Sequence, residues 1–484
     1  MRTERIEPRA SLLIQSMRDI GYSLETALAD ILDNSITAGG QNIRLLADTT
    51  SRHPAFGILD DGTGMDESQL LQAMRLGSQS PLDVREGDDL GRFGLGLKTA
   101  SFSQCKRLTV VSRKDGAALT CARWDLEYIA TTDDWLVQFT DDTSKVPWVE
   151  QLGPHGTLVV WEDLDRLTDA TEQGRKDLVA KINEAMEHIS LVFHRFLAGE
   201  RGLKKVQMSI NGNPLKPFDP FHSTHSATDA GNIEKLRLAG HEVTIQAFTL
   251  PHHQKVTPAE WEKYAGRAGY VKNQGFYVYR GKRLIIHGTW FGLARQMELT
   301  KLARVRIDMP NSLDIDWKID VKKASARPPR QVKDRLRALI DSIGGSSTRI
   351  YTSKGRRLIA NNQLPVWYRH QQNNLISYGL DPDHPIFKSF MDRLADDTRE
   401  DFLKIIEMAG STLPVDALIA DIGSKPELVS GDAMSPEAME HAVTATYRQL
   451  TSAGLSKDQI LTMLQAAEPF RSRWELTQQI IERR

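Results

Sequence analysis

Residues 30–35 of the chain read DILDNS and lie inside a stretch, residues 11–38, in which apolar residues recur every three or four positions. This period predicts one helix with a buried apolar face, which two consecutive glycines then end. Asp30 and Asn34 are four residues apart and therefore share one helix face. The amide oxygen of Asn34 could ligate Mg²⁺, and Asp30 could orient or deprotonate a water. Taken alone, the pair is more typical of a solvated polar stripe.

A second motif, DDGTG, occupies residues 60–64, directly after a short apolar stretch that predicts a strand. Gly62 and Gly64 allow the backbone to approach a flat ligand closely. An ionised carboxylate only accepts hydrogen bonds, so Asp60 could select an exocyclic amine such as that of adenine. An isolated motif of this kind is more often a surface turn.

A third motif, GRFGLGLKT, occupies residues 91–99 and ends a Gly-, Ser- and Asp-rich stretch, residues 77–96, that suits a mobile loop. Glycines before a predicted helix can present backbone N–H groups to phosphates, and Lys98 adds positive charge. A Walker A loop needs Gly-Lys-Ser/Thr in direct sequence, and Leu97 separates Gly96 from Lys98, so a P-loop is disfavoured. The alternative is a flexible glycine linker.

The composition excludes several classes of protein. The 484 residues, 40% hydrophobic and 26% charged, fit about two to four globular domains rather than a fibrous or disordered chain. With Lys+Arg 62 and Asp+Glu 63, no global attraction to nucleic acid or membrane follows. Cys105 and Cys121 cannot build a disulfide framework and lack metal-ligand spacing. Because signal-peptide and membrane-span patterns are missing, we expect a cytoplasmic protein without a membrane partner.

The order of predicted elements is that of an α+β protein with three domains, residues 1–165, 166–330 and 331–484. Expected in the first domain are strands at 42–47, 55–59, 108–112, 118–125, 135–139 and 157–161, and helices at 66–76 and 97–104. Expected in the second are a helix at 175–198, strands at 206–210, 235–250, 268–280 and 283–287, and a closing segment at 303–321. An Asn211-Gly212 pair predicts a hairpin after the first of these strands. The third domain is expected to be mostly helical.

The three motifs resemble the ATP site of the GHKL superfamily, which contains gyrase B, Hsp90, histidine kinases, MutL and MORC ATPases. The superfamily's N-box, DxGxG and GxxGxG motifs occur here in order, and Gly156-Thr157 resembles its late Gly-Thr pair. The chain is most similar to MORC ATPases and their bacterial relatives, followed by MutL. GLGLKTA at 94–100 resembles the MORC glycine motif, and FYVYRGKRLI at 276–285 resembles a transducer strand pair. Over residues 10–330, the resemblance implies a Bergerat-type ATP-binding α/β sandwich followed by an S5-like transducer domain.

The resemblance also implies ATP and Mg²⁺ as ligands and assigns roles by position. Asn34 would ligate Mg²⁺, Asp60 would bind the adenine amino group, and Asp30 would be the general base. The other implied ATP-binding residues are Gly62, Gly64, Met65, Gly91, Gly94, Leu95, Gly96, Lys98, Thr99 and Thr157. The family's base is usually glutamate, so the shorter Asp30 implies slow hydrolysis. Asp33 is the nearest alternative carboxylate, although it projects about 100° away from Asn34.

By the same resemblance, a lysine of the transducer touches the γ-phosphate. In DWKIDVKK at residues 316–323, aligning Asp316 with the aspartate of the MutL motif puts this catalytic lysine at Lys323. Lys322 is the neighbouring candidate, and the alternation of side chains along a strand allows only one of them to point inward. The alternative is that both belong to a basic stretch.

The implied function is a Mg²⁺-dependent ATPase that forms an ATP-dependent homodimeric clamp on DNA, in the context of restriction or anti-phage defence. Residues 322–357 carry 11 Lys and Arg and 2 Asp and Glu, a net charge of +9, and are the predicted salt-sensitive DNA contact. The alternatives are an Hsp90-like protein remodeller and an ATP-dependent partner-binding switch without DNA contact. A histidine kinase is disfavoured because the ATP domain starts near residue 10.

The C-terminal third resembles no named family and contains apolar residues at helical spacing. They are Ile460, Leu461, Leu464, Trp474, Leu476, Ile480 and Ile481. A second dimer interface, a docking site for partner proteins and a plain intramolecular core are all compatible with this pattern. His370 and His384 stand alone in the sequence and are interpreted as ordinary polar residues.

Overall fold

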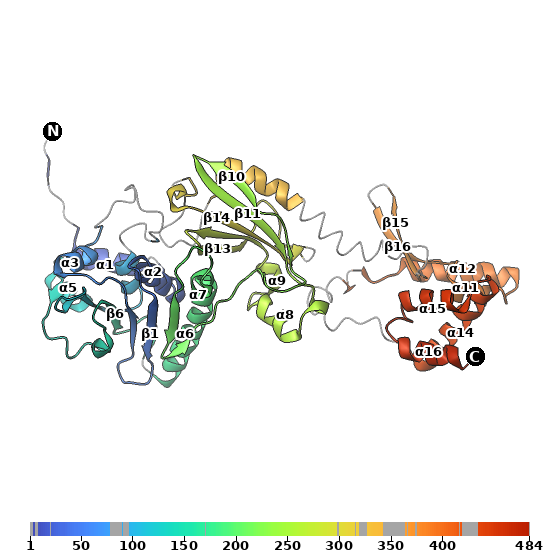
Figure 1. Ribbon diagram of the computed structural model, residues 1–484, viewed down its shortest axis with the longest axis horizontal. Helices are drawn as coiled ribbons and strands as arrows, with labels where there is room; N and C mark the ends of the chain where they lie inside the picture. Colours follow the sequence, from blue (N-terminus) through green and yellow to red (C-terminus); the bar gives the residue numbers. More distant parts are fainter. Residues whose placement is uncertain are drawn as a thin grey trace. The chain divides into compact units, whose positions relative to one another are not determined.

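The computed structural model of the protein describes residues 3–4, 8–19, 21–77, 90, 96–169, 171–297, 300–314, 316–318, 327–341, 364, 366–372, 375–415, 417–418 and 434–483. The chain separates into two compact units. The first comprises Met1–Gln296 with Lys301–Ala338, and the second Met297–Thr300 with Leu339–Arg484. The first unit contains two sheets, and the second is mostly helical (Figure 1). The protein is therefore of mixed α+β class, as the sequence predicts.

The first sheet has eight strands in the order β5-β4-β3-β6-β2-β1-β7-β8. They are β1 (Asn42–Asp48), β2 (Ala55–Asp60), β3 (Arg107–Arg113), β4 (Thr120–Asp125), β5 (Gln138–Phe139), β6 (Gly156–Glu162), β7 (Gln207–Ile210) and β8 (Asn213–Pro214). Neighbouring strands pair antiparallel except β1 and β7, which are parallel. The predicted strands at 42–47, 55–59, 108–112 and 157–161 are confirmed, whereas the one at 135–139 is reduced to β5.

Seven helices accompany this sheet among the described residues. They are α1 (Ala10–Arg18), α2 (Leu24–Thr37), α3 (Glu67–Met74), α4 (Gly96–Phe102), α5 (Leu126–Thr132), α6 (Glu172–Val192) and α7 (His194–Ala198). One apolar core joins the sheet to α1, α2, α4 and α6, with Leu28, Trp161 and Ile189 among its fully buried members. A smaller core on Val111 and Leu158 lies elsewhere on the same sheet. The sheet is therefore buried on more than one side, which fixes the strand ends that carry the motifs.

The single helix predicted over residues 11–38 is wrong. The structure has two helices, and Gly21 lies between them with a φ of +82°, which favours glycine. The apolar period continues across this break because both helices bury residues in the same core. Helix α5 was not predicted from the sequence. The Asp125 carboxylate caps this helix by accepting hydrogen bonds from the N–H groups of Glu127 and Tyr128.

The hairpin predicted at Asn211-Gly212 is confirmed, with φ values of +46° and +83° at its two turn residues. Its first strand, β7, was expected in the second domain but pairs with β1 of the first sheet. The helix predicted at 175–198 is α6 and α7, and α6 packs against α2. The first sheet therefore continues past residue 165, where the sequence divides the first two domains.

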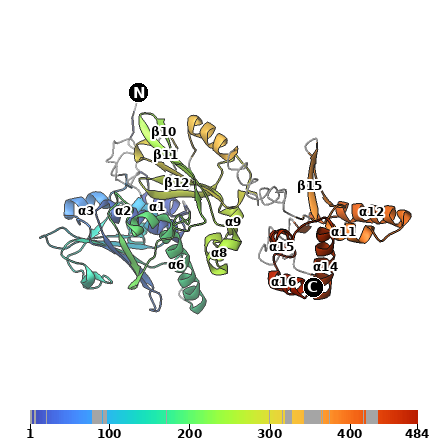
Figure 2. The same cartoon turned by 45° about the vertical axis from the view of Figure 1, so that its right-hand side comes forward.

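The second sheet has six strands, in the order β10-β11-β14-β12-β13 with β9 pairing with β11. Figure 2 labels β10, β11 and β12 of this sheet. The six strands are β9 (Asp229–Ala230), β10 (Glu234–Leu238), β11 (His241–Thr249), β12 (Gly275–Arg280), β13 (Arg283–Thr289) and β14 (Ala303–Met309). Helices α8 (Pro258–Ala265) and α9 (Gly269–Lys272) pack where β11 and β14 meet, through a cluster on Leu250, Tyr270 and Leu302. The strand predicted at 268–280 is therefore wrong in its first half, which forms α9.

The second unit contains a hairpin of β15 (Trp367–Gln372) and β16 (Leu375–Leu380), which the sequence analysis did not predict. The helices α11 (Pro385–Met391), α12 (Asp396–Ser411), α14 (Pro436–Ser452), α15 (Lys457–Ala466) and α16 (Trp474–Glu482) follow. Of the seven apolar residues singled out in this region, Ile460, Leu464, Ile480 and Ile481 are buried in one cluster, and the others pack against it. The structure thus supports the intramolecular core. Among the helices that the structure describes, none combines the length and apolar character needed to cross a bilayer.

Candidate nucleotide-binding site

Asp60 ends β2 and lies buried in the first sheet, with only 6% of its surface exposed. One carboxylate oxygen accepts the hydroxyl of Ser35 at 2.8 Å. The other accepts the backbone N–H groups of Gly62 at 2.9 Å and Thr157 at 3.2 Å. Burial raises the pKa of Asp60 to about 6, while these three hydrogen bonds to the ionised form oppose the rise. The result is a carboxylate with a fixed orientation that is ionised near neutral pH.

The glycines around Asp60 are required by close backbone packing. Gly64 has a φ of +67°, and a Cβ there would lie 1.8 Å from the carbonyl oxygen of Arg113. Gly156 has a φ of +127°, and its Cβ would lie 2.1 Å from the carbonyl oxygen of Asp60. Any side chain at either position would push β3 or β6 away from the DDGTG turn. These two glycines therefore set the position of the carboxylate through the backbone.

Ser112, which the sequence analysis missed, links three parts of this region. Its hydroxyl accepts the N–H of Met65 at 2.8 Å, donates to the carbonyl of Gly156 at 3.0 Å and lies 2.9 Å from the hydroxyl of Thr157. Through these contacts, Met65 and Thr157 are brought next to Asp60, as the motif order implied. Ser112 stands in an ordinary strand sequence, so no local pattern marked it in advance.

Asp30 lies on α2, buried at its carboxylate but next to the start of α4. A Cβ placed on Gly96, the first residue of α4, would lie 3.7 Å from the Oδ2 atom of Asp30. The hydroxyl of Tyr22 donates to the same oxygen at 3.0 Å. Asn34, one turn along α2, is exposed. The structure thus places Asp30 beside Gly96, with Asn34 one turn further along α2, and Tyr22 is a neighbour of Asp30 that the sequence analysis did not single out.

Asp33, the alternative carboxylate, points elsewhere. It is 1% exposed, and its Oδ1 atom lies 3.2 Å from the Nε atom of Arg283 on β13. The carboxylate of Asp33 is therefore occupied by an ion pair with an arginine of the second sheet. The structure therefore favours Asp30 over Asp33 as the carboxylate beside the start of α4.

Lys98 and Thr99, on α4, are both buried. The ammonium of Lys98 donates to the carbonyl oxygen of Ala73, near the end of α3, at 2.8 Å. Burial lowers the pKa of Lys98 to about 8. The predicted phosphate contact of Lys98 stays a prediction, because in this structure its ammonium is directed to the last turn of α3, where a helix carries partial negative charge.

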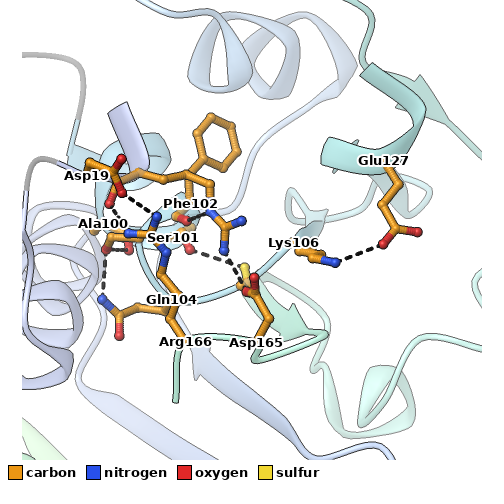
Figure 3. A network of polar contacts seen from close by, with 12 residues as sticks. Asp19, Ala100, Ser101, Phe102, Gln104, Lys106, Glu127, Asp165 and Arg166 are labelled. Carbon is orange, nitrogen blue, oxygen red and sulfur yellow. Dashed lines mark hydrogen bonds and ion pairs between the residues drawn. The ribbon is translucent and has the colours of Figure 1, made fainter. Parts of the chain in front are cut away.

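The end of α4 is tied to the turn between α1 and α2 (Figure 3). Arg18 donates to the carbonyl oxygen of Phe102 at 2.8 Å and forms an ion pair with Asp165 at 2.6 Å. Gln104 donates to the carbonyl oxygen of Tyr22 at 3.2 Å. These bonds fix the backbone of Tyr22 against α4, and so they fix the hydroxyl that reaches Asp30.

A second arginine strengthens the same junction. Arg166 donates to the carbonyl oxygen of Arg18 and forms an ion pair with Asp19 (Figure 3). Because β6 leads directly to Arg166, the α1–α2 turn is attached to the sheet as well as to α4. The position of Tyr22 is therefore determined by several independent contacts.

Several predicted site residues lie outside the described residues. They are Gly91, Gly94, Leu95, Lys322 and Lys323, together with most of the basic stretch at 322–357. Within the described part of the chain, no group of three or more His, Cys, Asp or Glu side chains could hold a metal ion. A Mg²⁺ ion bound to nucleotide does not need such a group, because waters and phosphates supply most of its ligands. One exposed amide oxygen at Asn34 fits that requirement.

Comparison with known proteins agrees with this geometry. Residues 22–156 match the family model of histidine kinase-, DNA gyrase B- and HSP90-like ATPases. Over 91 residues, the chain is 28% identical to the ATPase morc-1 of Caenorhabditis elegans. That match covers 19% of this chain and 10% of the length of the relative. ATPases of this type bind ATP with Mg²⁺ and hydrolyse it. Residues 22–156 are therefore a GHKL-type ATPase domain, in a chain that is distantly similar to a MORC ATPase.

Proposed function

We propose that the chain is a Mg²⁺-dependent ATPase in which Asp60 binds adenine and Asp30 activates the attacking water. The observation that carries this proposal is the pairing of two differently placed carboxylates within the matched domain. Asp60 is buried and held by three hydrogen bonds, which suits an acceptor for the adenine amino group. Asp30 faces the start of α4, where a motif of glycines is suited to phosphates.

Asp30 would act as the general base, and Tyr22 would hold it in place. Aspartate is one methylene shorter than the glutamate usual in this family, so its reach is shorter. The Tyr22 hydroxyl donates to the Oδ2 atom of Asp30 at 3.0 Å, which would fix the orientation of the carboxylate that accepts the proton. We infer slow turnover, because the water must lie closer to α2 than a glutamate would require.

Asn34 would hold Mg²⁺ through its amide oxygen. When bound, the ion offsets the negative charge of the phosphates. The proposal further assigns Gly62, Gly64 and Met65 to the adenine side of the site. It assigns Gly91, Gly94, Leu95, Gly96, Lys98 and Thr99 to the phosphate side, Thr157 to adenine, and Lys323, or its neighbour Lys322, to the γ-phosphate.

We further propose that ATP drives homodimerisation into a clamp on DNA, with a role in restriction or anti-phage defence. The similarity to a MORC ATPase and the net charge of +9 at residues 322–357 support this view. ATP can favour the closed dimer only if it binds that state more tightly. The alternatives are an Hsp90-like remodeller and a switch that binds partner proteins, for which the second unit offers the docking region.

The first test is molar mass by light scattering, with and without Mg²⁺ and a non-hydrolysable ATP analogue. We expect a shift from monomer to dimer with the analogue in the wild type, and none in Asn34→Ala. The dimer should then bind DNA with an affinity that falls steeply as salt rises. If the molar mass does not change when nucleotide is added, the ATP-gated clamp is rejected. If nucleotide produces a dimer that does not bind DNA, the partner-binding switch is favoured.

A further inference from the structure

The turn between β12 and β13 contacts the ATPase domain from the second sheet. We call residues 280–283, Arg280-Gly281-Lys282-Arg283, the arginine turn. Its two arginines are among the buried charged residues of the protein. Each guanidinium also makes one contact with the ATPase side, Arg283 with Asp33 of α2 and Arg280 with Leu90.

Arg283 reaches α2 at the turn of helix that also carries Asp30 and Asn34. Its Nε atom lies 3.2 Å from the Oδ1 atom of Asp33, and the two side chains are 7% and 1% exposed. Its guanidinium also lies over the ring of Phe193, 5.7 Å from the centroid. A buried pair of this kind has one geometry that satisfies both partners, so it resists rotation or sliding of α2.

Arg280 reaches the chain just before the glycine motif. Its Nε atom and one terminal nitrogen each donate a hydrogen bond to the carboxylate of Asp314 at 2.8 Å. Its other terminal nitrogen donates to the carbonyl oxygen of Leu90 at 2.9 Å. The N–H of Leu90 in turn donates to the hydroxyl of Thr37, the last residue of α2, at 3.2 Å. Asp314 thus aligns the guanidinium, and Leu90 connects it to α2.

These contacts connect the second sheet to α2 and to Leu90. Arg283 pairs with Asp33 of α2. The hydroxyl of Thr37, at the end of α2, accepts the N–H of Leu90, and the carbonyl oxygen of Leu90 accepts a hydrogen bond from Arg280. Leu90 directly precedes Gly91 in the sequence. By contrast, three backbone or hydroxyl donors hold Asp60, and none of them belongs to the second sheet. The arginine turn therefore acts on the phosphate side of the site rather than on the adenine side.

We propose that Arg280 and Arg283 are positioning residues for ATP hydrolysis, an inference that rests on the ATPase function proposed above. They set the position of α2, and with it Asp30 and Asn34, relative to the chain that enters the glycine motif. Misplacing a catalytic group by about 1 Å can cost about a hundredfold in rate. The two arginines touch neither water nor nucleotide in this scheme, and they act through Asp33 and Leu90.

The test compares full-length Arg283→Lys and Arg280→Lys with the wild type. Lysine keeps a positive charge opposite Asp33 and Asp314, so neither buried carboxylate is left without a cation. It lacks the planar guanidinium, and so it loses the fixed hydrogen-bond geometry of arginine. We expect kcat for Mg–ATP to fall about tenfold or more, with ADP affinity within about threefold of the wild type. If the two arginines had a merely structural role, the substitutions would lower kcat and ADP affinity together, or would change neither quantity.

The matched control is Arg195→Lys. Arg195 is also a buried arginine that joins an α-helix of the ATPase side to the second sheet, through ion pairs with Asp308 and Glu200. We expect Arg195→Lys to lower the thermal midpoint as much as Arg283→Lys does, while its kcat stays within about twofold of the wild type. An equal loss of kcat in Arg195→Lys and Arg283→Lys would overturn the proposal.

A second measurement uses the wild-type chain alone and does not depend on a variant folding. Because coupling between sites is reciprocal, occupation of the phosphate side should stabilise the arginine turn. We expect hydrogen exchange at residues 280–286 to slow with Mg²⁺ and a non-hydrolysable ATP analogue, and to change less with ADP. Bound analogue without any slowing there would overturn the inference. No binding of any nucleotide would instead reject the proposed ATPase function itself, and the inference with it.

Discussion

Tyr22 donates its hydroxyl to the carboxylate of Asp30 across 3.0 Å, inside the core of the ATPase domain. Tyr22 lies in the segment between α1 and α2, eight positions before Asp30 in the sequence. The turn that carries Tyr22 is attached to α4, which begins at Gly96 beside Asp30. The orientation of the proposed base is therefore determined by a residue that precedes α2, and not by α2 alone.

Tyr22→Phe removes only this hydroxyl. We expect kcat for ATP hydrolysis to fall about tenfold and the free energy of unfolding to fall by about 1 kcal/mol, because one buried oxygen of Asp30 loses a donor. Steady-state phosphate release and chemical denaturation measure the two effects. Tyr128→Phe, which alters an exposed tyrosine of α5, is the control and should match the wild type. Normal turnover in Tyr22→Phe would show that this hydrogen bond does not orient the base.

Asp30→Asn should separate binding from hydrolysis. The amide has the size of the carboxylate but cannot take a proton, so we expect phosphate release to fall about a hundredfold or more while ATP still binds. Calorimetric titration with ATP and a phosphate-release assay test the two halves of the prediction. Glu25→Gln, which neutralises another carboxylate of α2, should leave the rate unchanged. A variant at Asp30 that hydrolyses ATP at the wild-type rate would exclude Asp30 as the base.

Nucleotide affinity should depend on pH through Asp60. Burial raises its pKa from 3.8 to about 6, so the folded protein takes up a proton as pH falls through about 6, before the unfolded chain does. The ionised carboxylate is the stronger acceptor, so ADP affinity should weaken at pH 5 relative to pH 7.5. Calorimetry at the two pH values measures this, with circular dichroism confirming that the protein stays folded. In Asp60→Asn, affinity should be lower and independent of pH in this range.

The raised pKa of Asp60 also predicts how the free energy of unfolding changes with pH. Between pH 3.8 and about 6 the folded state binds more protons than the unfolded state, so the free energy of unfolding falls as pH rises through that window. Above about pH 6 the contribution of Asp60 is constant, and it is unfavourable. Denaturation of Asp60→Asn should show a smaller decrease of stability across the window than the wild type.

Ser35→Ala should shift this pH dependence upward. The Ser35 hydroxyl bonds the ionised form of Asp60 at 2.8 Å and so lowers its pKa. Its removal should raise the pH at which ADP affinity is lost and lower the free energy of unfolding by about 1–3 kcal/mol. ADP titrations across pH provide the measurement. Ser68→Ala, at an exposed position on α3, is the control; an unchanged midpoint in Ser35→Ala would contradict the assigned role.

The parts of the site that could be predicted from the sequence are those whose geometry is local. The DDGTG turn needs glycine at position 64 because a side chain there would meet the backbone of β3, and that need is visible as a motif. The central strand β2 was equally clear, because it is buried at every residue and such a strand reads as a short continuous apolar run. In each case, neighbouring residues in the sequence carry the whole physical requirement.

The rest of the site depends on contacts between distant residues, which no local pattern records. Arg283 and Asp33 are 250 residues apart, and each looks like an ordinary charged residue in its own segment. The break at Gly21 was missed for a related reason, since the apolar period on both sides follows the shared core rather than a continuous helix. The roles assigned to the site residues stay predictions, and Gly91, Gly94, Leu95 and Lys323 also lie outside the described residues.

The parallel pairing of β7 with β1 has a practical consequence for anyone who wishes to produce the ATPase domain by itself. A fragment that stops at residue 156, where the family match ends, would leave β1 as a bare edge open to aggregation, and would strip α6 from α2. Extension beyond β8 restores the edge but still separates Asp33 from Arg283. A fragment that keeps both features must continue through β14, which pairs with both β11 and β12 in the second sheet. A fragment trimmed by sequence similarity alone would therefore be unstable.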